Sequence, residues 1–162
     1  MSTTTAATRT RDARSLLTAE EFAGVAATVK RANPGMETTL AERITVEALA
    51  FVATAANRSS GRLAPSPVVD EGWHALILHT RVYADLCTRL GGRFVHHIPQ
   101  PPNPTHPHVP GILAFTQAAI TGAGFQVDEE LWQPGPKASA ECQHVPNCGD
   151  TECEANCESG PN

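Results

Sequence analysis

Four stretches of the chain repeat apolar residues at spacings of three and four positions, and stop signals separate them. This spacing places side chains on one face of an α-helix. The first stretch follows a capping box, Thr18-Ala-Glu-Glu21, and ends at Asn33-Pro34-Gly35. The others are expected at about residues 37–57, from Pro67 to Gly91-Gly92, and at about 112–121. The pattern predicts an all-α fold, a small bundle of about four main helices.

The segments between and beyond these helices set the domain organisation. An extended piece, Arg93 to Ile98, is expected before six prolines between Pro99 and Pro110, which exclude regular helix. Asp128 is expected to cap a short turn that holds Leu131 and Trp132. We expect a disordered N-terminus (1–13), one helical His-rich domain (14–133), a Pro/Gly linker (134–141) and a Cys-rich C-terminal tail (142–162).

Charge and hydropathy restrict the partners and the compartment. The net charge is −5 and no basic run is present, which argues against nucleic acid binding. No apolar stretch has the length of a membrane span, and the first thirteen residues lack the apolar core of a secretory signal. We therefore expect a cytoplasmic protein with no membrane partner. In that compartment cysteines more often bind metals or react than form structural disulfides.

The segment from Val69 to Pro99 concentrates groups that bind metals or move protons. A solvated surface helix has no need of so many imidazoles, so the segment predicts a polar site, most economically a metal site. In the alternative interpretation the histidines bond to backbone carbonyls and an acidic residue caps the helix. His106 and His108, in the proline-rich loop, are expected to be solvated. The candidate metal ligands are Asp70, His74, His79, His96 and His97.

Helix and strand geometry limits which of these ligands can meet. At about 100° per residue, Asp70 and His74 lie about 40° apart, whereas His79 lies about 140° from His74. Either the helix bends, or only one of the two histidines is a ligand. Successive residues His96 and His97 point in opposite directions on an extended segment, so at most one readily faces the helix.

Such a ligand set resembles the two-His-one-carboxylate arrangement that binds iron(II), and zinc is the other candidate metal. Tyr83 and Cys87 would then support the ligands or exchange electrons with the metal. A nucleophilic role for Cys87 is the weaker interpretation, because the residue lies on the apolar face of its helix. The sequence assigns neither a reaction nor an oligomeric state.

The tail offers a second set of metal-binding side chains. Four thiolates and an imidazole suit tetrahedral zinc or an iron–sulfur cluster, and zinc would supply folding free energy that the tail lacks. Other interpretations remain open. The thiols could be redox-active. The tail could be the part of a ribosomally made peptide precursor on which a modifying enzyme acts, or the interacting segment of a binding protein. It could also be disordered with no specific role. The residues concerned are Cys142, His144, Cys148, Cys153 and Cys157.

The histidine-rich segment resembles the glycine-rich domain-containing protein-like family, and in particular a bacterial branch of it. The pattern is an Asp-x-x-Trp-His-x-His helix followed by a tyrosine, a cysteine and a later histidine. Here Leu76 replaces the second histidine, so the resemblance implies that His79, His96 or His97 supplies that ligand. The resemblance extends over about residues 16–133. It is carried by Asp70, Trp73, His74, Ile77, Thr80, Tyr83, Cys87 and the pair His96-His97.

Overall fold

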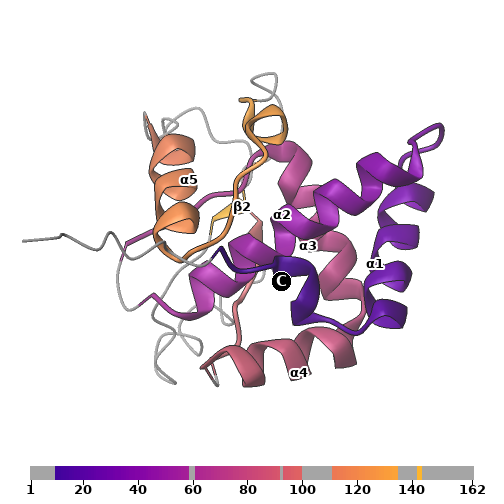
Figure 1. Ribbon diagram of the computed structural model, residues 1–162, viewed down its shortest axis with the longest axis horizontal. Coiled ribbons are helices and arrows are strands. Elements are labelled where there is room, and N and C mark those ends of the chain that lie inside the picture. Colours follow the sequence, from indigo (N-terminus) through magenta and orange to yellow (C-terminus); the bar gives the residue numbers. More distant parts are fainter. Residues whose placement is uncertain (1–9, 59–60, 92, 100–110, 135–141, 144–162) are drawn as a thin grey trace, which may run out of the picture.

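The computed structural model describes residues 10–58, 61–91, 93–99, 111–134 and 142–143, and this part of the chain is mostly helical (Figure 1). The predicted all-α class is confirmed. None of the helices in the described ranges has both the length and the apolar character of a membrane span. The elements in chain order are η1 (Ala13–Leu16), α1 (Ala19–Ala32), α2 (Thr38–Ala56), α3 (Pro67–Leu78), α4 (Thr80–Gly91), β1 (Ile98–Pro99), α5 (Ile112–Gly122), η2 (Glu129–Trp132) and β2 (Cys142–Gln143).

Local capping fixes where the first and third helices begin. Thr18 Oγ1 accepts a hydrogen bond from the backbone N–H of Glu21 at 3.2 Å, and the Glu21 carboxylate accepts one from the backbone of Thr18 at 2.9 Å. The predicted capping box is therefore present. Helix α3 begins at Pro67, and the hydroxyl of Ser66 accepts from the backbone N–H of Val69. Both starts satisfy N–H groups that a helix leaves without partners.

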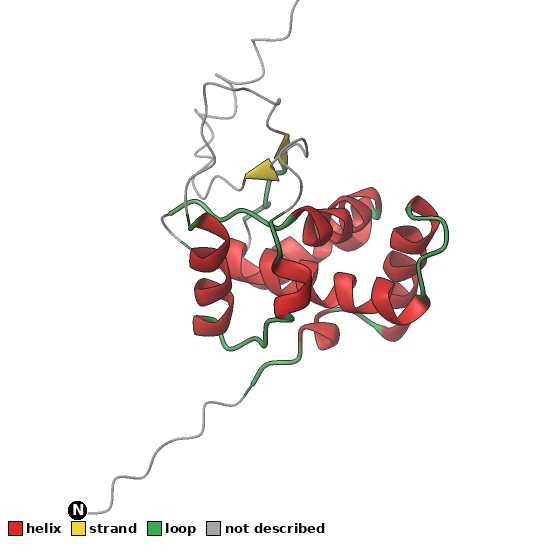
Figure 2. Ribbon diagram, turned by 90° about the horizontal axis from the view of Figure 1, so that it is seen from above, coloured by secondary structure: helices red, strands yellow, loops and turns green. Residues whose placement is uncertain are grey.

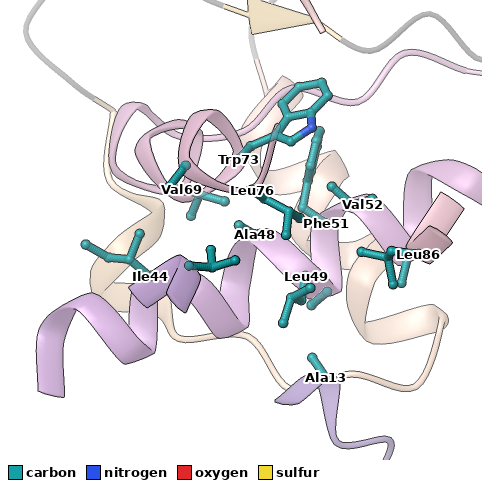
Figure 3. Packing of buried hydrophobic residues seen from close by; sticks show 14 of the residues in the cluster. Ala13, Ile44, Ala48, Leu49, Phe51, Val52, Val69, Trp73, Leu76 and Leu86 are labelled. Carbon is teal, nitrogen blue, oxygen red and sulfur yellow. The ribbon is translucent and has the colours of Figure 1, made fainter. Parts of the chain in front are cut away.

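Helix α2 forms the centre of the hydrophobic core, and Figure 3 shows its side chains among those of its neighbours. Leu49, Phe51 and Val52 on α2 are fully buried, as is Trp73 on α3. The two helices approach closely at Gly72, where a Cβ atom would lie 2.8 Å from the carbonyl oxygen of Ile44. A glycine at this position therefore permits the contact between α2 and α3, the helix that carries the candidate site.

The predicted third helix, continuous from Pro67 to Gly91, is wrong in one respect: it is two helices that meet at His79. The backbone of His79 has φ −84° and ψ 62°, which is not helical, and α4 starts at the next residue. The imidazole Nε2 of His79 lies 2.8 Å from Thr28 Oγ1 on α1. This tertiary contact accompanies the break. Because the break divides the predicted third helix in two, the described residues form five α-helices instead of about four.

A buried carboxylate attaches the segment after α5 to the core. Glu47 on α2 accepts hydrogen bonds from the backbone of Asp128 at 3.0 Å and from Trp132 Nε1 at 2.7 Å. Burial raises the pKa of Glu47. Asp128 precedes the predicted turn, but its carboxylate pairs with Arg43 at 2.7 Å and makes no cap. Arg11, assigned above to the disordered N-terminus, contacts this segment through a hydrogen bond from its backbone N–H to the carbonyl of Gly124.

The strands β1 and β2 pair antiparallel, with Ile98 opposite Gln143 and Pro99 opposite Cys142. The pair lies outside the helical layers (Figure 2). It joins the extended segment after α4 to the first residues of the Cys-rich tail.

Candidate metal centre

Three of the predicted ligands converge at one point beside α3. Asp70 lies in the first turn of the helix and His74 one turn later, whereas His97 comes from the extended segment after α4. The Nε2 atom of His97 lies 3.1 Å from Asp70 Oδ1, and that of His74 lies 3.4 Å from Asp70 Oδ2. The three residues offer ligand atoms that all lie within 4.8 Å of one another. The group could therefore hold a metal ion.

The separations between the three residues can be compared with those between the ligands of one metal ion. Zinc–nitrogen and zinc–oxygen bonds of 2.0–2.2 Å place tetrahedral ligands about 3.3 Å apart. The two histidines approach different oxygens of Asp70, at 3.1 and 3.4 Å, and one ligand atom from each residue can be chosen so that all three lie within 4.8 Å. Without an ion, a carboxylate only accepts hydrogen bonds, so the contact between His97 and Asp70 places the proton on His97 Nε2. A bound cation would replace that proton.

The site is buried on one side and open on the other. The side chains of Asp70 and His97 are each 9% exposed, whereas that of His74 is 47% exposed. The imidazole of His97 packs between Trp73 and His74, with ring centroids 4.5 and 4.4 Å away. A carboxylate buried to this degree needs partners of opposite charge or hydrogen-bond donors, and the two histidines supply them.

Hydrogen bonds around the hydroxyl of Tyr83, on α4, hold the segment that carries His97. The hydroxyl of Tyr83 accepts from Trp73 Nε1 at 3.0 Å and donates to the carbonyl of Val95. Trp73, Tyr83 and Val95 are all at most 1% exposed. The backbone two residues before His97 is thus fixed to α4, and the aromatic ring against His97 is fixed to the same hydroxyl.

Cys87 lies in the same buried cluster as Tyr83 and Val95, and this environment does not activate its thiol. It is 2% exposed, and burial raises the pKa of its thiol, outweighing the opposing effect of the neighbouring Val95 backbone and Tyr83 hydroxyl. Burial also raises the pKa of Tyr83, so its hydroxyl stays protonated as a donor. A buried thiol with a raised pKa is a poor nucleophile. The geometry thus favours a supporting role for Tyr83 and Cys87.

The other two predicted ligands of the helical domain lie elsewhere. His79 contacts Thr28 on α1, and His96 is exposed, with its ring 4.9 Å from that of Phe94. The expected alternation is present: Val95 is buried and His97 mostly buried, while Phe94 and His96 are exposed. Alternation alone could not show which of the two histidines faces the helices, because Phe94 precedes His96 by two residues and the equally apolar Val95 precedes His97 by two. The contact of Trp73 with His97 has no signal in the sequence.

The second predicted site is mostly beyond the part of the chain that the structure describes. Of its residues, Cys142 is placed only through the backbone pairing of β2 with β1. His144, Cys148, Cys153 and Cys157 lie outside the described residues, as do His106 and His108. A metal or redox site in the tail stays a prediction.

Comparison with known proteins corrects the family assignment. Residues 12–103, more than half of the chain, match the UCP032817-like family. The resemblance to the glycine-rich domain-containing protein-like family is therefore wrong. The residues that suggested it, from Asp70 to His97, all fall inside the matched range, so that short pattern did not distinguish the two families. No curated protein and no solved structure matches the chain. The protein belongs to the UCP032817-like family.

Proposed function

We propose that this protein binds a divalent transition metal, zinc(II) or iron(II), through Asp70, His74 and His97. The observation that carries the proposal is the meeting of one carboxylate and two imidazoles from two separate segments, with both histidine Nε2 atoms 3.1–3.4 Å from the carboxylate oxygens of Asp70. One carboxylate and two imidazoles form a donor set that suits zinc and iron.

The exposure of the site indicates what a metal could do there. Three protein ligands leave at least one coordination position free on a four-coordinate ion and more on a six-coordinate one. His74 lies on the exposed side, so water or a small substrate can approach from there. A metal held by these residues would supply a Lewis acid for water or, as iron, a binding position for dioxygen. Asp70 and His97 would hold it from the buried side and His74 from the exposed side.

Metal binding is tested in a full-length variant that cannot bind metal through its tail. This tail-substituted protein carries Ser in place of Cys142, Cys148, Cys153 and Cys157, and Ala in place of His144. We expect it to bind one zinc or cobalt(II) ion per chain in a calorimetric titration. His97→Ala should weaken binding by about 100-fold or more, because a three-ligand site loses one of its ligands.

His96→Ala is the matched control, since it removes an imidazole one residue away that faces solvent beside Phe94. Its metal affinity should stay within about two-fold of the parent. Two results would refute the proposed site. One is an equal loss of metal affinity in His96→Ala and His97→Ala, and the other is the absence of any metal binding in the tail-substituted protein.

A further inference from the structure

The candidate metal centre and the Cys-rich tail meet through the backbone. His97 is directly followed by Ile98, the first residue of β1, and β1 pairs with Cys142 and Gln143 at the start of the tail. Consecutive residues of a strand are about 3.3 Å apart. Ile98 and Pro99 therefore lie within about two such steps of a proposed metal ligand.

The segment from Val95 to Pro99 is held at three successive places. The hydroxyl of Tyr83 donates a hydrogen bond to the carbonyl of Val95. The carboxylate of Asp70 accepts a hydrogen bond from the imidazole of His97. Strand β2 pairs with Ile98 and Pro99, the last two residues. The first contact lies in the core, with Tyr83 and Val95 both at most 1% exposed. His97 is therefore the attachment to the helical domain that lies nearest to β1 among these contacts.

We propose that metal binding at Asp70, His74 and His97 is thermodynamically linked to the pairing of β1 with β2, so that the metal holds the tail on the helical domain. The inference rests on the proposed metal site. Coordination restricts the motion of His97 more than a single hydrogen bond does, and presents the next two residues in the paired conformation. Linkage is reciprocal, so the paired tail must strengthen metal binding by the same factor.

The segment that binds to the edge of β1 is the start of the chain's own tail, because β2 at Cys142–Gln143 already pairs with β1. Strand edges carry unpaired N–H and C=O groups and readily accept another strand. Charge also favours attachment of the tail. The tail is acidic, and a divalent cation beside Asp70 would add positive charge near the point of attachment. The acidic residues are Asp150, Glu152, Glu154 and Glu158, and Glu141 directly precedes the tail.

Hydrogen exchange in the tail-substituted protein tests the linkage, because zinc cannot then act through the tail's own thiols. Zinc should slow amide exchange at residues 142–143 by about five-fold or more. It should do the same in His96→Ala and have no effect in His97→Ala. In the reverse direction, Gln143→Pro removes a backbone donor from β2 and should weaken zinc binding by the same factor. Ser139→Pro, in the linker, is the control and should leave zinc affinity unchanged.

The outcomes separate the two proposals. If zinc binds with unchanged affinity in Gln143→Pro and exchange at residues 142–143 does not respond to zinc, the linkage is overturned while the metal site stands. If the tail-substituted protein binds no zinc, both proposals are overturned. If zinc slows amide exchange at residues 142–143 equally in His97→Ala, the linkage is also contradicted, since the effect would not originate at this metal site.

Discussion

Replacing Tyr83 by phenylalanine removes one hydroxyl that connects the core to the segment of the candidate ligand His97. The aromatic ring stays, together with its edge contact to Phe94 at a centroid distance of 5.1 Å. Two buried groups lose a partner: Trp73 Nε1, which donates to the hydroxyl at 3.0 Å, and the carbonyl of Val95, which accepts from it.

The magnitude follows from these two groups. A buried donor or acceptor left without a partner costs about 1–3 kcal/mol. Some relaxation is expected, so Tyr83→Phe should lower the free energy of unfolding by about 2–4 kcal/mol. Domains of this size are stable by about 5–15 kcal/mol, so the variant should still fold. Urea denaturation followed by circular dichroism measures the loss, and an unchanged slope against urea shows that the folded state is compact.

A double-mutant cycle with Trp73→Phe separates the hydrogen bond from other effects of the substitution. Once the indole N–H is absent, the Tyr83 hydroxyl has one buried partner fewer, so its removal should cost about 1 kcal/mol less than in the parent. Phe94→Leu, which removes the exposed ring that contacts both Tyr83 and His96, is the control for a change in ring packing. A loss below about 0.5 kcal/mol in Tyr83→Phe would refute the reasoning, because it would mean that the hydroxyl satisfies neither group in solution.

Three further predictions concern packing, pH and metal. Gly72→Ala should destabilise the protein by about 1–3 kcal/mol in thermal unfolding, because its Cβ would lie 2.8 Å from the Ile44 carbonyl oxygen; Gly122→Ala, with open space around its Cβ, is the control and should be neutral or slightly stabilising. Burial raises the pKa of Glu47, so the folded state favours the protonated form. The stability of the parent relative to Glu47→Gln should fall as the pH rises from the unfolded-state pKa of about 4.3 to the higher folded value, as measured by urea denaturation across that range. Zinc at 100 times its dissociation constant should raise the free energy of unfolding of the tail-substituted protein by about 2.7 kcal/mol, an effect that His97→Ala abolishes and that acid weakens because imidazole ligands must lose their protons.

The sequence predicted those parts of the fold that depend on neighbouring residues. The start of α1 follows from Thr18 and Glu21, and that of α3 from Ser66 and Pro67, because each cap acts within one helical turn. The break at His79 was not predictable in this way. It is accompanied by a hydrogen bond to Thr28, which is 51 residues away along the chain. A local pattern carries no information about such a partner.

The sequence predicted the candidate site, too, only as far as neighbouring residues along the chain determine it. Spacing placed Asp70 and His74 on one face of a helix and showed that His79 could not join them on a straight one. It could not choose among His79, His96 and His97, because that choice depends on the path of the chain after Gly91. The structure settles the path through Val95, which is buried against Tyr83 and leaves His97 on the inward side of the segment.

The break at His79 also explains how one stretch of chain provides both the ligands and their support. Trp73 and Tyr83 are ten residues apart, which in a continuous helix is about 15 Å along the axis. Helical side chains all lean toward the N-terminus, so two of them cannot reach toward each other across that gap. Their hydrogen bond at 3.0 Å therefore requires that α4 turn away from the axis of α3. A chain that kept residues 67–91 as one helix would keep Asp70 and His74 together but lose the hydroxyl that fixes Val95, and with it the position of the third ligand.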